Sequence, residues 1–578
     1  MLAEIKTFLQ KNDIDFLLLP NNDEFFSEYL PESKRLIKEI TNFSGSNAVV
    51  IFGLKKSFFF TDSRYILQAK NQVDNQEYEI LDIANSPLIK WLKANLFNKK
   101  IALFSKLTTV DFVSEIEKFA SNNIEFFDEI FIDKIWINRP ISKPSKIFYC
   151  DKKISGKSDI EKRKIIGDEI SGDAILITNA DDLAWLLNIR IHDFENSPLL
   201  LAYAILFKDG KVDLFIDEKR LSDLTLEHVN CIAEDNLDLR LSFLRKVIKI
   251  IDVDFNKTNY FLLKQLQKNN FIINNKKSSI ELLKSQKNLQ EINGAKKSHQ
   301  FDGLALTKFI LWLKKTIKIQ DIDEISAQEK LHEFRQENKN FIGESFATIS
   351  AFASNGAIVH YHADKNSCKK IIGNSLYLLD SGGQYLGEDF FGTTDVTRTL
   401  LIGNASADMI EKYTLVLKGH IALARVKFPR GLTGSNLDIL ARFHLWQIGE
   451  DYGHGTGHGV GAFANVHEGP CAINLRNRVE LLPNMILSNE PGYYKEGHYG
   501  IRLENLQRII EIDKKFLAFE SLTLVPFEAD LIDFKMLTYP EKKWLKNYHQ
   551  KILAEFIPEL KDDLQSDLSR LCEVFVNL

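Results

Sequence analysis

A strand-and-turn pattern occurs twice in the first half of the chain, and it constrains the fold more than any other feature. The run DFLLLPNNDE at residues 15–24 is matched by DAILITNADD at 173–182. Further along, NAVVIFGLKKSFFFTDSRY at 47–65 is matched by LLLAYAILFKDGKVDLFIDEKR at 199–220. An offset of roughly 155 residues predicts two copies of one domain-sized α/β unit rather than a short-period solenoid. The alternative is that any two α/β domains share this order of strands and turns.

Length and sequence breaks divide the chain further. Its 578 residues correspond to about three to five domains. Two prolines in NRPISKPSK (138–146) interrupt the periodic pattern, and a long helical segment begins near Asn288. We therefore expect one domain over residues 1–143, a second over 144–288 and a third over 289–578 that ends in a helical C-terminal extension.

Composition excludes several classes of protein. Lys and Arg total 74 against 79 Asp and Glu, a net charge of −5, so no global positive field exists for nucleic acid or anionic lipid. Five scattered cysteines without a C-x-x-C motif predict neither a disulfide framework nor a thiolate zinc site, and they favour the cytoplasm. The N-terminal segment lacks a signal-peptide pattern, and no apolar run is long enough to span a membrane.

Two aspartates stand where apolar, strand-like runs end or begin. Asp380 ends SLYLLD, and Asp395 begins DVTRTLLIG after a glycine-rich turn. A hairpin would bring the two carboxylates together, where they repel each other. Either a cation lies between them or one of them is protonated. The simpler alternative for either residue is an aspartate that caps a turn.

Two glutamates interrupt apolar runs in the same way. Glu490 closes LLPNMILSNE, and in GIRLEN the alternation of a strand places Arg502 and Glu504 on one face. Buried carboxylates are costly unless they are paired or bound to a metal. Arg502 could pair with one of them, but it cannot neutralise four acidic groups.

The segment YGHGTGHGVGAFANVHEGP (452–470) contains three of the 13 histidines. Glycine at alternate positions lets the backbone approach a site closely and direct His458 into it. A single histidine means little, but His454, His458 and His467 together favour a metal ligand or proton carrier.

Charge balance connects these residues. Four carboxylates and one imidazole would balance the +4 charge of two divalent ions; the set is Asp380, Asp395, His458, Glu490 and Glu504. Oxygen-rich ligation favours Mn²⁺, with Zn²⁺ or Co²⁺ as alternatives. Two such ions lower the pKa of a shared water and generate hydroxide, which indicates hydrolysis of an amide or ester.

The motifs DSGGQY, GTTDVTRT, YGHGTGHGVG, NEPGYY and GIRLEN resemble the metal-ligand segments of the aminopeptidase P (Xaa-Pro aminopeptidase) family. FSGSNA with TDSRYILQA resembles the first of that family's two creatinase-like domains, and TNADDLAWLLNIR the second. The resemblance covers nearly the whole chain. It implies a multi-domain fold of the α/β and α+β classes, in which two creatinase-like N-terminal α/β domains are followed by a pita-bread catalytic domain. It also implies a cytoplasmic homodimer.

The resemblance assigns a role to each matching residue. It implies that Asp380, Asp395, His458, Glu490 and Glu504 bind the metals, that Asp395 and Glu504 bridge the two ions, and that Glu490 is the general base. His360 and His467 match substrate-contacting histidines that can donate to the developing oxyanion. The remaining substrate-binding candidates are Arg64, His454 and Arg502.

Two departures from the family pattern affect these assignments. LGEDFFG lengthens the turn between Asp380 and Asp395 by about four residues, which leaves its tip uncertain. Near the first histidine the chain reads AFASNGAIVHYH, so His362 is a second candidate beside His360. We favour His360 because it matches the family's HY dipeptide.

The expected reaction is hydrolysis of the bond between an N-terminal residue and a following proline, by a hydroxide that bridges two divalent metal ions. A prolidase-type dipeptidase and a methionine aminopeptidase are alternatives, although the two N-terminal domains argue against both. A pita-bread pseudo-enzyme that binds proteins is a third alternative, but such proteins lose ligands and this chain retains all five.

Overall fold

The computed structural model describes residues 1–120, 123–127, 130–141, 145–191, 195–220 and 225–578. They form two compact units. Unit 1 comprises residues 1–151, 157–194 and 198–280, and unit 2 comprises 152–156, 195–197 and 281–578. The expected boundary between residues 143 and 144 lies outside the described residues.

The first sheet of unit 1 has six strands in the order β4-β3-β2-β1-β5-β6. Its strands are β1 (Phe16–Pro20), β2 (Val49–Gly53), β3 (Ser57–Thr61), β4 (Tyr78–Asp82), β5 (Ile101–Phe104) and β6 (Ile124–Phe127). The accompanying helices are α1 (Leu2–Lys11), α2 (Leu36–Thr41), α3 (Ile66–Gln72), α4 (Leu88–Asn95), α5 (Val110–Ala120) and α6 (Ile130–Ile135). Leu17 and Leu19 pack on one face of β1 and Leu18 on the other, as expected for a strand buried on both sides.

The second sheet repeats the first strand by strand, in the order β12-β11-β10-β8-β13-β14. Its strands are β8 (Ala174–Ile177), β10 (Tyr203–Phe207), β11 (Val212–Phe215), β12 (Val229–Ile232), β13 (Ile250–Val253) and β14 (Ile272–Asn275). Its helices include α8 (Asp159–Glu169), α9 (Ala180–Leu187), α10 (Leu237–Leu244) and α11 (Tyr260–Lys268), and a short pair joins β7 (Phe148–Tyr149) to β9 (Ile189–Arg190).

The two sheets also share their strand directions. The central strand of each is antiparallel to one neighbour and parallel to the other, as β1 is to β2 and β5, and as β8 is to β10 and β13. The repeat seen in the sequence therefore corresponds to two α/β layers of the same topology.

Unit 2 contains three antiparallel sheets. The six-stranded one has the order β21-β28-β27-β24-β22-β23, and two three-stranded ones have the orders β16-β17-β20 and β15-β18-β19. Their bounds are β15 (Phe341–Glu344), β16 (Ile349–Phe352), β17 (Ser375–Ser381), β18 (Gly383–Leu386), β19 (Phe391–Thr393), β20 (Val396–Ile402), β21 (Lys427–Pro429), β22 (Gly457–Gly459), β23 (Glu468–Ile473), β24 (Ile486–Asn489), β27 (Asn505–Glu511) and β28 (Phe516–Ser521). A two-stranded ribbon pairs β25 (Gly492–Lys495) with β26 (Tyr499–Arg502).

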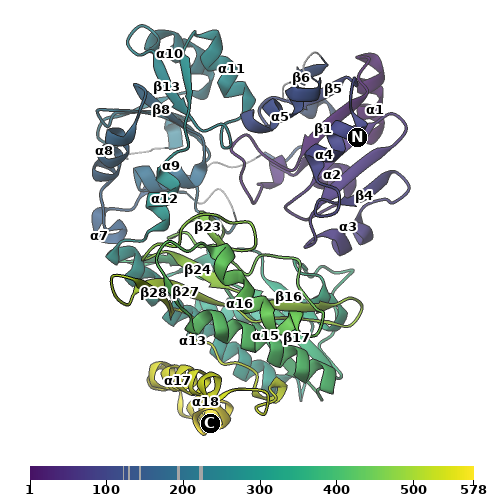
Figure 1. The fold of residues 1–578 in the computed structure, drawn as a ribbon, viewed down its shortest axis with the longest axis vertical. Helices are drawn as coiled ribbons and strands as arrows, with labels where there is room; N and C mark the ends of the chain where they lie inside the picture. The colour runs from purple at the N-terminus through teal and green to yellow at the C-terminus, as the bar shows by residue number, and fades with distance from the viewer. Residues whose placement is uncertain (121–122, 128–129, 142–144, 192–194, 221–224) are drawn as a thin grey trace. The chain divides into compact units, whose positions relative to one another are not determined.

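Helices cover the sheets of unit 2, with α15 and α16 side by side and α17 beside α18 at the C-terminal end (Figure 1). The helices of this unit are α7 (Lys152–Ser155), α13 (Leu289–Thr316), α14 (Glu324–Gln336), α15 (Ala407–Arg425), α16 (Gly434–Trp446), α17 (Tyr539–Phe556) and α18 (Asp562–Val576), and α12 (Ile280–Ser285) joins the two units. Asn288 caps α13 with its side chain, so the long helix begins at Leu289. The expected helical C-terminal extension is present as α17 and α18.

A large hydrophobic core of unit 2 lies between the β25–β26 ribbon and the helices α15 and α17. Ile501 and Leu503 pack with residues of α15 and α17, such as Tyr413 and Leu545. Because side chains alternate along an extended segment, Arg502 and Glu504 face the other way, as the sequence predicted.

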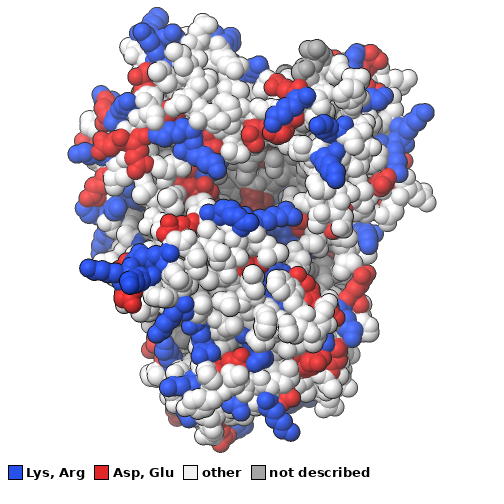
Figure 2. Space-filling view, in the orientation of Figure 1, with Lys and Arg blue, Asp and Glu red and all other residues white. Residues whose placement is uncertain are grey.

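Charges of both signs are interspersed over the face drawn in Figure 2, in keeping with the near-neutral balance of the chain. Among the described residues, none of the helices combines the length and the apolar character that crossing a bilayer requires.

Candidate metal centre

Asp380 lies near the end of β17 and is 8% exposed. Its Oδ2 accepts a hydrogen bond from Arg502 Nη2 at 2.7 Å, whereas its buried Oδ1 has no hydrogen-bond partner. The pairing with Arg502 that the sequence left open is therefore present, and it leaves one carboxylate oxygen available for a cation.

The turn after Asp380 is a small hairpin of its own. β18 and β19 pair with each other and join β15 in a separate sheet, so the extra residues form the tip of that hairpin. β17 and β20 pair directly, with Asp380 opposite Thr397. Asp395 therefore lies just before β20, beside Asp380, although the two residues do not form a simple hairpin pair.

Glu504 lies between β26 and β27 and is 1% exposed. Its backbone N–H donates to Thr397 O at 3.1 Å, and the Thr397 hydroxyl donates to Glu504 Oε2 at 2.7 Å. The other oxygen, Oε1, is buried without a hydrogen-bond partner. The two contacts with Thr397 hold Glu504 against β20 and next to Asp395.

His458 lies on β22, where glycines are needed on both sides of it. A Cβ at Gly457 would lie 2.0 Å from Ser488 O, and one at Gly459 would lie 2.3 Å from Glu468 O. Only glycine allows such close approach to the neighbouring strands. The Nδ1 atom of His458 lies 2.9 Å from Gly459 O, so the Nδ1–H tautomer leaves Nε2 free to bind a metal.

Glu490 follows β24 and is the most exposed carboxylate of the set, with 17% of its side chain accessible. The Ser488 hydroxyl donates to its Oε1 at 3.0 Å, and its backbone N–H donates to Thr456 O at 2.8 Å. Its Oε1 lies 3.4 Å from His458 Nε2, the same distance that separates this nitrogen from Asp395 Oδ2.

These side chains come together from segments that are far apart in the sequence. In each of three groups, all ligand atoms lie within 4.8 Å of one another; the groups are Asp380, Asp395 and Glu504; His458, Glu490 and Glu504; and Asp395, His458 and His467. The five expected ligands therefore form one continuous cluster, and His467 borders it.

The crowded, buried carboxylates of the cluster favour binding of a cation. Burial, followed by repulsion from Asp395 and Glu490, raises the pKa of Glu504 well above its usual range. Burial also raises the pKa of Asp395 to about 6. Although burial alone lowers the pKa of His458, its contacts with Asp395 and Glu490 raise it to about 9. Buried oxygens without partners, and crowded carboxylates around one imidazole nitrogen, fit a site for divalent metal ions.

The other histidines that the sequence analysis proposed for the site differ in their exposure. His467 is half-buried, with its ring centroid 4.2 Å from that of His458. His360 is half-buried, whereas His362 is exposed. His454 is 9% exposed, and its Nε2 lies 2.8 Å from the Tyr494 hydroxyl.

Tyr494 is a residue that the sequence did not single out. Its hydroxyl accepts from Arg502 Nη1 at 2.7 Å, so a continuous chain of contacts runs from His454 through Tyr494 and Arg502 to Asp380. The only signal was its place in the NEPGYY motif.

Arg64 belongs to unit 1. Its Nε and Nη2 donate to the two carboxylate oxygens of Asp62 at 2.9 Å and 2.7 Å, and 29% of its side chain is accessible. Asp62 thus holds the guanidinium in a fixed orientation.

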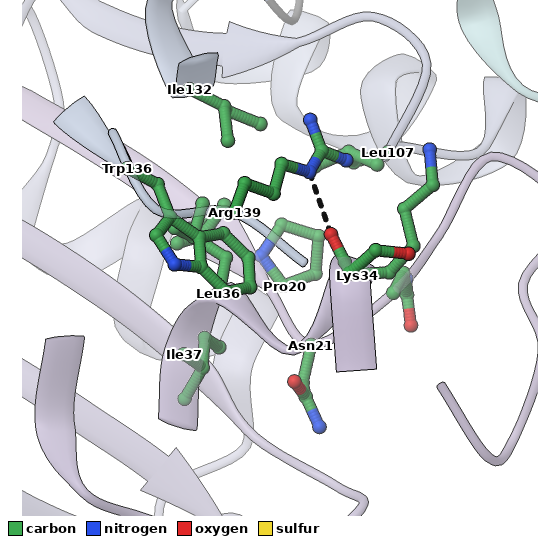
Figure 3. A pocket seen from close by; sticks show the side chains of 12 residues that line it. Pro20, Asn21, Lys34, Leu36, Ile37, Leu107, Ile132, Trp136 and Arg139 are labelled. Carbon is green, nitrogen blue, oxygen red and sulfur yellow. Dashed lines mark hydrogen bonds between the residues drawn. The ribbon is translucent and has the colours of Figure 1, made fainter. Parts of the chain in front are cut away.

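A separate pocket lies in the first sheet domain, between Pro20, Leu36 and Trp136 (Figure 3). Arg139 borders it and donates from Nε to Ser33 O at 2.6 Å. None of its lining residues is a histidine, aspartate or glutamate, so it lacks the ligands of a metal site.

Comparison with known families agrees with this architecture. Residues 1–131 and 138–291 each match the creatinase/prolidase N-terminal domain. Residues 293–511 match metallopeptidase family M24, and residues 515–573 match the C-terminal region of peptidase M24. The fold and the cluster together define a class, the pita-bread metallopeptidases.

Individual relatives narrow this class. A probable Xaa-Pro aminopeptidase P of Coprinopsis cinerea is 35% identical, with 97% of this chain and 96% of the relative covered. Xaa-Pro aminopeptidase 1 of Dictyostelium discoideum is 36% identical, with 96% and 92% covered. The chain belongs to the Xaa-Pro aminopeptidase P family.

A solved structure has the same fold over its whole length. The X-prolyl aminopeptidase of Caenorhabditis elegans, described as a cytosolic enzyme with a di-nuclear active site, has a TM-score of 0.92 and 32% identity. The comparison covers 99% of this chain and 98% of that one. The sequence-based expectations of fold, family and enzyme class are thereby confirmed.

Proposed function

We propose that this metalloaminopeptidase removes the N-terminal residue from peptides whose second residue is proline, and that the carboxylate and imidazole cluster holds two divalent metal ions. The residues that would hold the ions are Asp380, Asp395, His458, Glu490 and Glu504, of which Asp395 and Glu504 would serve both ions. The observation that carries the proposal is the pair of buried, unpartnered oxygens, Asp380 Oδ1 and Glu504 Oε1, within one cluster of acidic groups.

The metal is proposed to be Mn²⁺, because the donors are mainly carboxylate oxygens with a single imidazole. Zn²⁺ and Co²⁺ suit the same ligands. When bound, two such ions lower the pKa of a shared water to near neutrality and neutralise charge on the substrate carbonyl.

The residues around the cluster perform the remaining steps. Glu490 is the proposed general base, since it is the most accessible carboxylate and Ser488 orients one of its oxygens. It accepts the proton of the attacking water and passes it to the departing proline nitrogen. His360 and His467 donate hydrogen bonds to the scissile carbonyl oxygen as it becomes an oxyanion.

Three further residues are proposed to take part in peptide binding. His454 and Arg502 act through the Tyr494 hydroxyl, which contacts both of them. Arg64, held by Asp62, offers its remaining guanidinium donors to peptide oxygens, in its own or a neighbouring subunit.

The proposed specificity follows from the chemistry of the X–Pro bond. It is a tertiary amide without an N–H and with a fixed φ, so peptidases that grip an extended backbone through that donor handle it poorly. A site that recognises the proline ring and the free N-terminal amine avoids this need.

Metal analysis combined with hydrolysis of an Xaa-Pro-Yaa tripeptide tests the proposal. The protein should take up about two metal equivalents; chelation should abolish hydrolysis and Mn²⁺ should restore it. Xaa-Pro dipeptides and Met-Ala peptides should be poorer substrates. Faster cleavage of dipeptides would favour a prolidase-type activity, and tight peptide binding without hydrolysis would favour a protein-binding role.

The assembly and location are proposed as a homodimer in the cytoplasm. An apolar stripe on the exposed side of α16 supports the dimer, because Ile439, Phe443 and Trp446 are 45%, 49% and 37% exposed at helical spacing. Sedimentation of the wild type and of Phe443→Glu would test it, since a monomeric wild type contradicts the proposal. Cell fractionation would test the location.

A further inference from the structure

Glu324 is a fully buried carboxylate at the first position of α14, and its side chain is 0% exposed. Five hydrogen bonds end on it. Oε1 accepts from Phe352 N at 2.6 Å and from Asn355 Nδ2 at 3.0 Å. Oε2 accepts from Asn355 Nδ2 at 3.0 Å, from Lys369 N at 2.8 Å and from the Tyr361 hydroxyl at 2.9 Å. The helix N-terminus adds a favourable field for the negative charge.

All of these donors belong to one loop, residues 352–369, which links β16 to the segment before β17. Glu324 contacts its beginning at Phe352, its middle at Asn355 and Tyr361, and its end at Lys369. A single carboxylate therefore fixes the path of the loop at four points.

The loop is also held in a conformation that it would not adopt alone. Ala353 has a φ of 54°, in the left-handed region that costs a residue with a Cβ about 1–2 kcal/mol. It lies between Phe352 and Asn355, both anchored on Glu324. Strained residues of this kind persist where the surrounding contacts determine them, and they are frequent at functional sites.

The far side of the loop contacts β26, whose Arg502 binds Asp380 of the metal-binding cluster. Gly356 and Gly500 approach so closely that a Cβ on Gly500 would lie 1.7 Å from Gly356 O. Val359 O accepts from Arg502 Nη2 at 3.3 Å, and the same Nη2 donates to Asp380 at 2.7 Å. His360 is the next residue, between Val359 and the anchored Tyr361.

We propose that Glu324 is a positioning residue, which fixes the loop 352–369 so that His360 points at the scissile carbonyl. This inference rests on the proposed function of His360. Glu324 provides no metal ligand and touches no substrate; it acts through the Tyr361 hydroxyl and the loop backbone. A carboxylate is required because its two oxygens act only as acceptors, and together they accept five hydrogen bonds from four donor atoms.

The decisive variant is Glu324→Gln in the full-length, Mn²⁺-restored enzyme, because the amide keeps the shape but directs its NH₂ group at donors. We expect kcat for an Xaa-Pro-Yaa tripeptide to fall about tenfold to a hundredfold, as a misplaced group of this kind does. KM and metal content should change little, because the ligands lie on other strands. Glu528→Gln, another buried glutamate at 1% exposure, is the matched control and should retain kcat.

A double-mutant cycle separates positioning from general destabilisation. In a His360→Ala background, Glu324→Gln should cause little further loss, since the two changes remove the same contribution. Tyr361→Phe deletes one of the five hydrogen bonds, so it should cause a smaller loss of kcat that also disappears in the His360→Ala background. This variant replaces Glu324→Gln in the cycle if Glu324→Gln fails to fold.

Multiplicative losses, or metal release by Glu324→Gln, would overturn the inference while leaving the proposed peptidase function intact. If His360→Ala leaves kcat unchanged, the role of His360 and this inference both fail. If wild-type protein with two bound metals does not hydrolyse the tripeptide, the proposed function itself fails.

Discussion

Arg502 Nη2 lies 2.7 Å from Asp380 Oδ2, and both side chains are buried, at 2% and 8% exposure. The same guanidinium reaches the Tyr494 hydroxyl through Nη1 and the Thr397 hydroxyl through Nε. One planar group thus connects a metal-binding candidate to two neighbouring strands. The contact fixes which oxygen of Asp380 remains available to a cation.

This relationship predicts that Arg502→Lys impairs the site although the charge is retained. An ammonium is a single point of donation and cannot hold Asp380, Tyr494 and Thr397 in the same plane. We expect kcat/KM and metal affinity to fall about tenfold to a hundredfold, as is usual when an outer contact of a metal ligand is lost. Metal titration and tripeptide kinetics measure this. Arg508→Lys is the control, because Arg508 pairs with Glu520 on β28. Equal losses of kcat/KM and metal affinity in the two variants would contradict the prediction.

Removal of Asp395, the carboxylate proposed to serve both ions, should have a larger effect. Asp395 belongs to two of the three groups of candidate ligands, so Asp395→Asn should abolish binding of both ions and hydrolysis together. Inductively coupled plasma analysis and activity assays measure the two losses. Asp389→Asn is the control, since Asp389 is a 51% exposed residue of the lengthened turn that pairs with Lys297 on the surface. Normal metal content in Asp395→Asn would refute the proposed ligand set.

The metal-binding candidates could be found from the sequence because each breaks a local rule. A carboxylate at the end of an apolar run, or a histidine among glycines, is unexpected unless another group compensates it. The two N-terminal domains could be predicted because their strand-and-turn pattern occurs twice in the sequence. In the structure β1 and β8 accordingly occupy the same place in sheets of the same strand order.

Glu324 could not be found in this way. It lies in QDIDEISAQEK, where acidic residues look like an exposed helix start. Its partners are mostly backbone groups at Phe352 and Lys369, whose approach depends on the tertiary fold. The hairpin of β18 and β19 was missed as well, because its pairing with β15 is a long-range contact.

The C-terminal extension should contribute directly to the stability of the catalytic domain. Arg398 is fully buried, and it donates to Glu504 O at 2.7 Å and to the Tyr548 hydroxyl of α17 at 2.9 Å. Tyr548→Phe removes one acceptor of Arg398 and leaves the buried Val525 N–H, which donates to the hydroxyl at 3.1 Å, without an acceptor. We therefore expect a loss of about 1–3 kcal/mol in unfolding free energy. Denaturant unfolding measures it. Tyr539→Phe, at a position that is 77% exposed, should leave stability unchanged; identical midpoints for both variants would contradict the prediction.

His549 predicts a defined pH dependence of stability. Burial lowers its pKa from 6.5 to about 3. Its Nδ1 lies 2.8 Å from Leu545 O and its Nε2 accepts from Phe527 N at 3.3 Å, so the ring is neutral in the folded protein. Because the folded-state pKa lies below the unfolded one, the unfolded chain binds the extra proton. The stability that depends on the neutral His549 ring is therefore fully present above about pH 6.5 and is lost as the pH falls towards 3.

The contribution of His549 to the slope of unfolding free energy against pH can be measured by comparing wild type with a variant that lacks this histidine. A single titrating group changes the unfolding free energy by about 1.4 kcal/mol per pH unit within its window. We expect wild type to lose stability more steeply than His549→Gln between pH 6 and pH 4, because the glutamine side chain does not titrate. His444→Gln, from a half-buried histidine on α16 whose pKa is also lowered by burial, should remove less of the slope. Parallel stability curves for wild type and His549→Gln would show that the His549 ring gains no proton on unfolding.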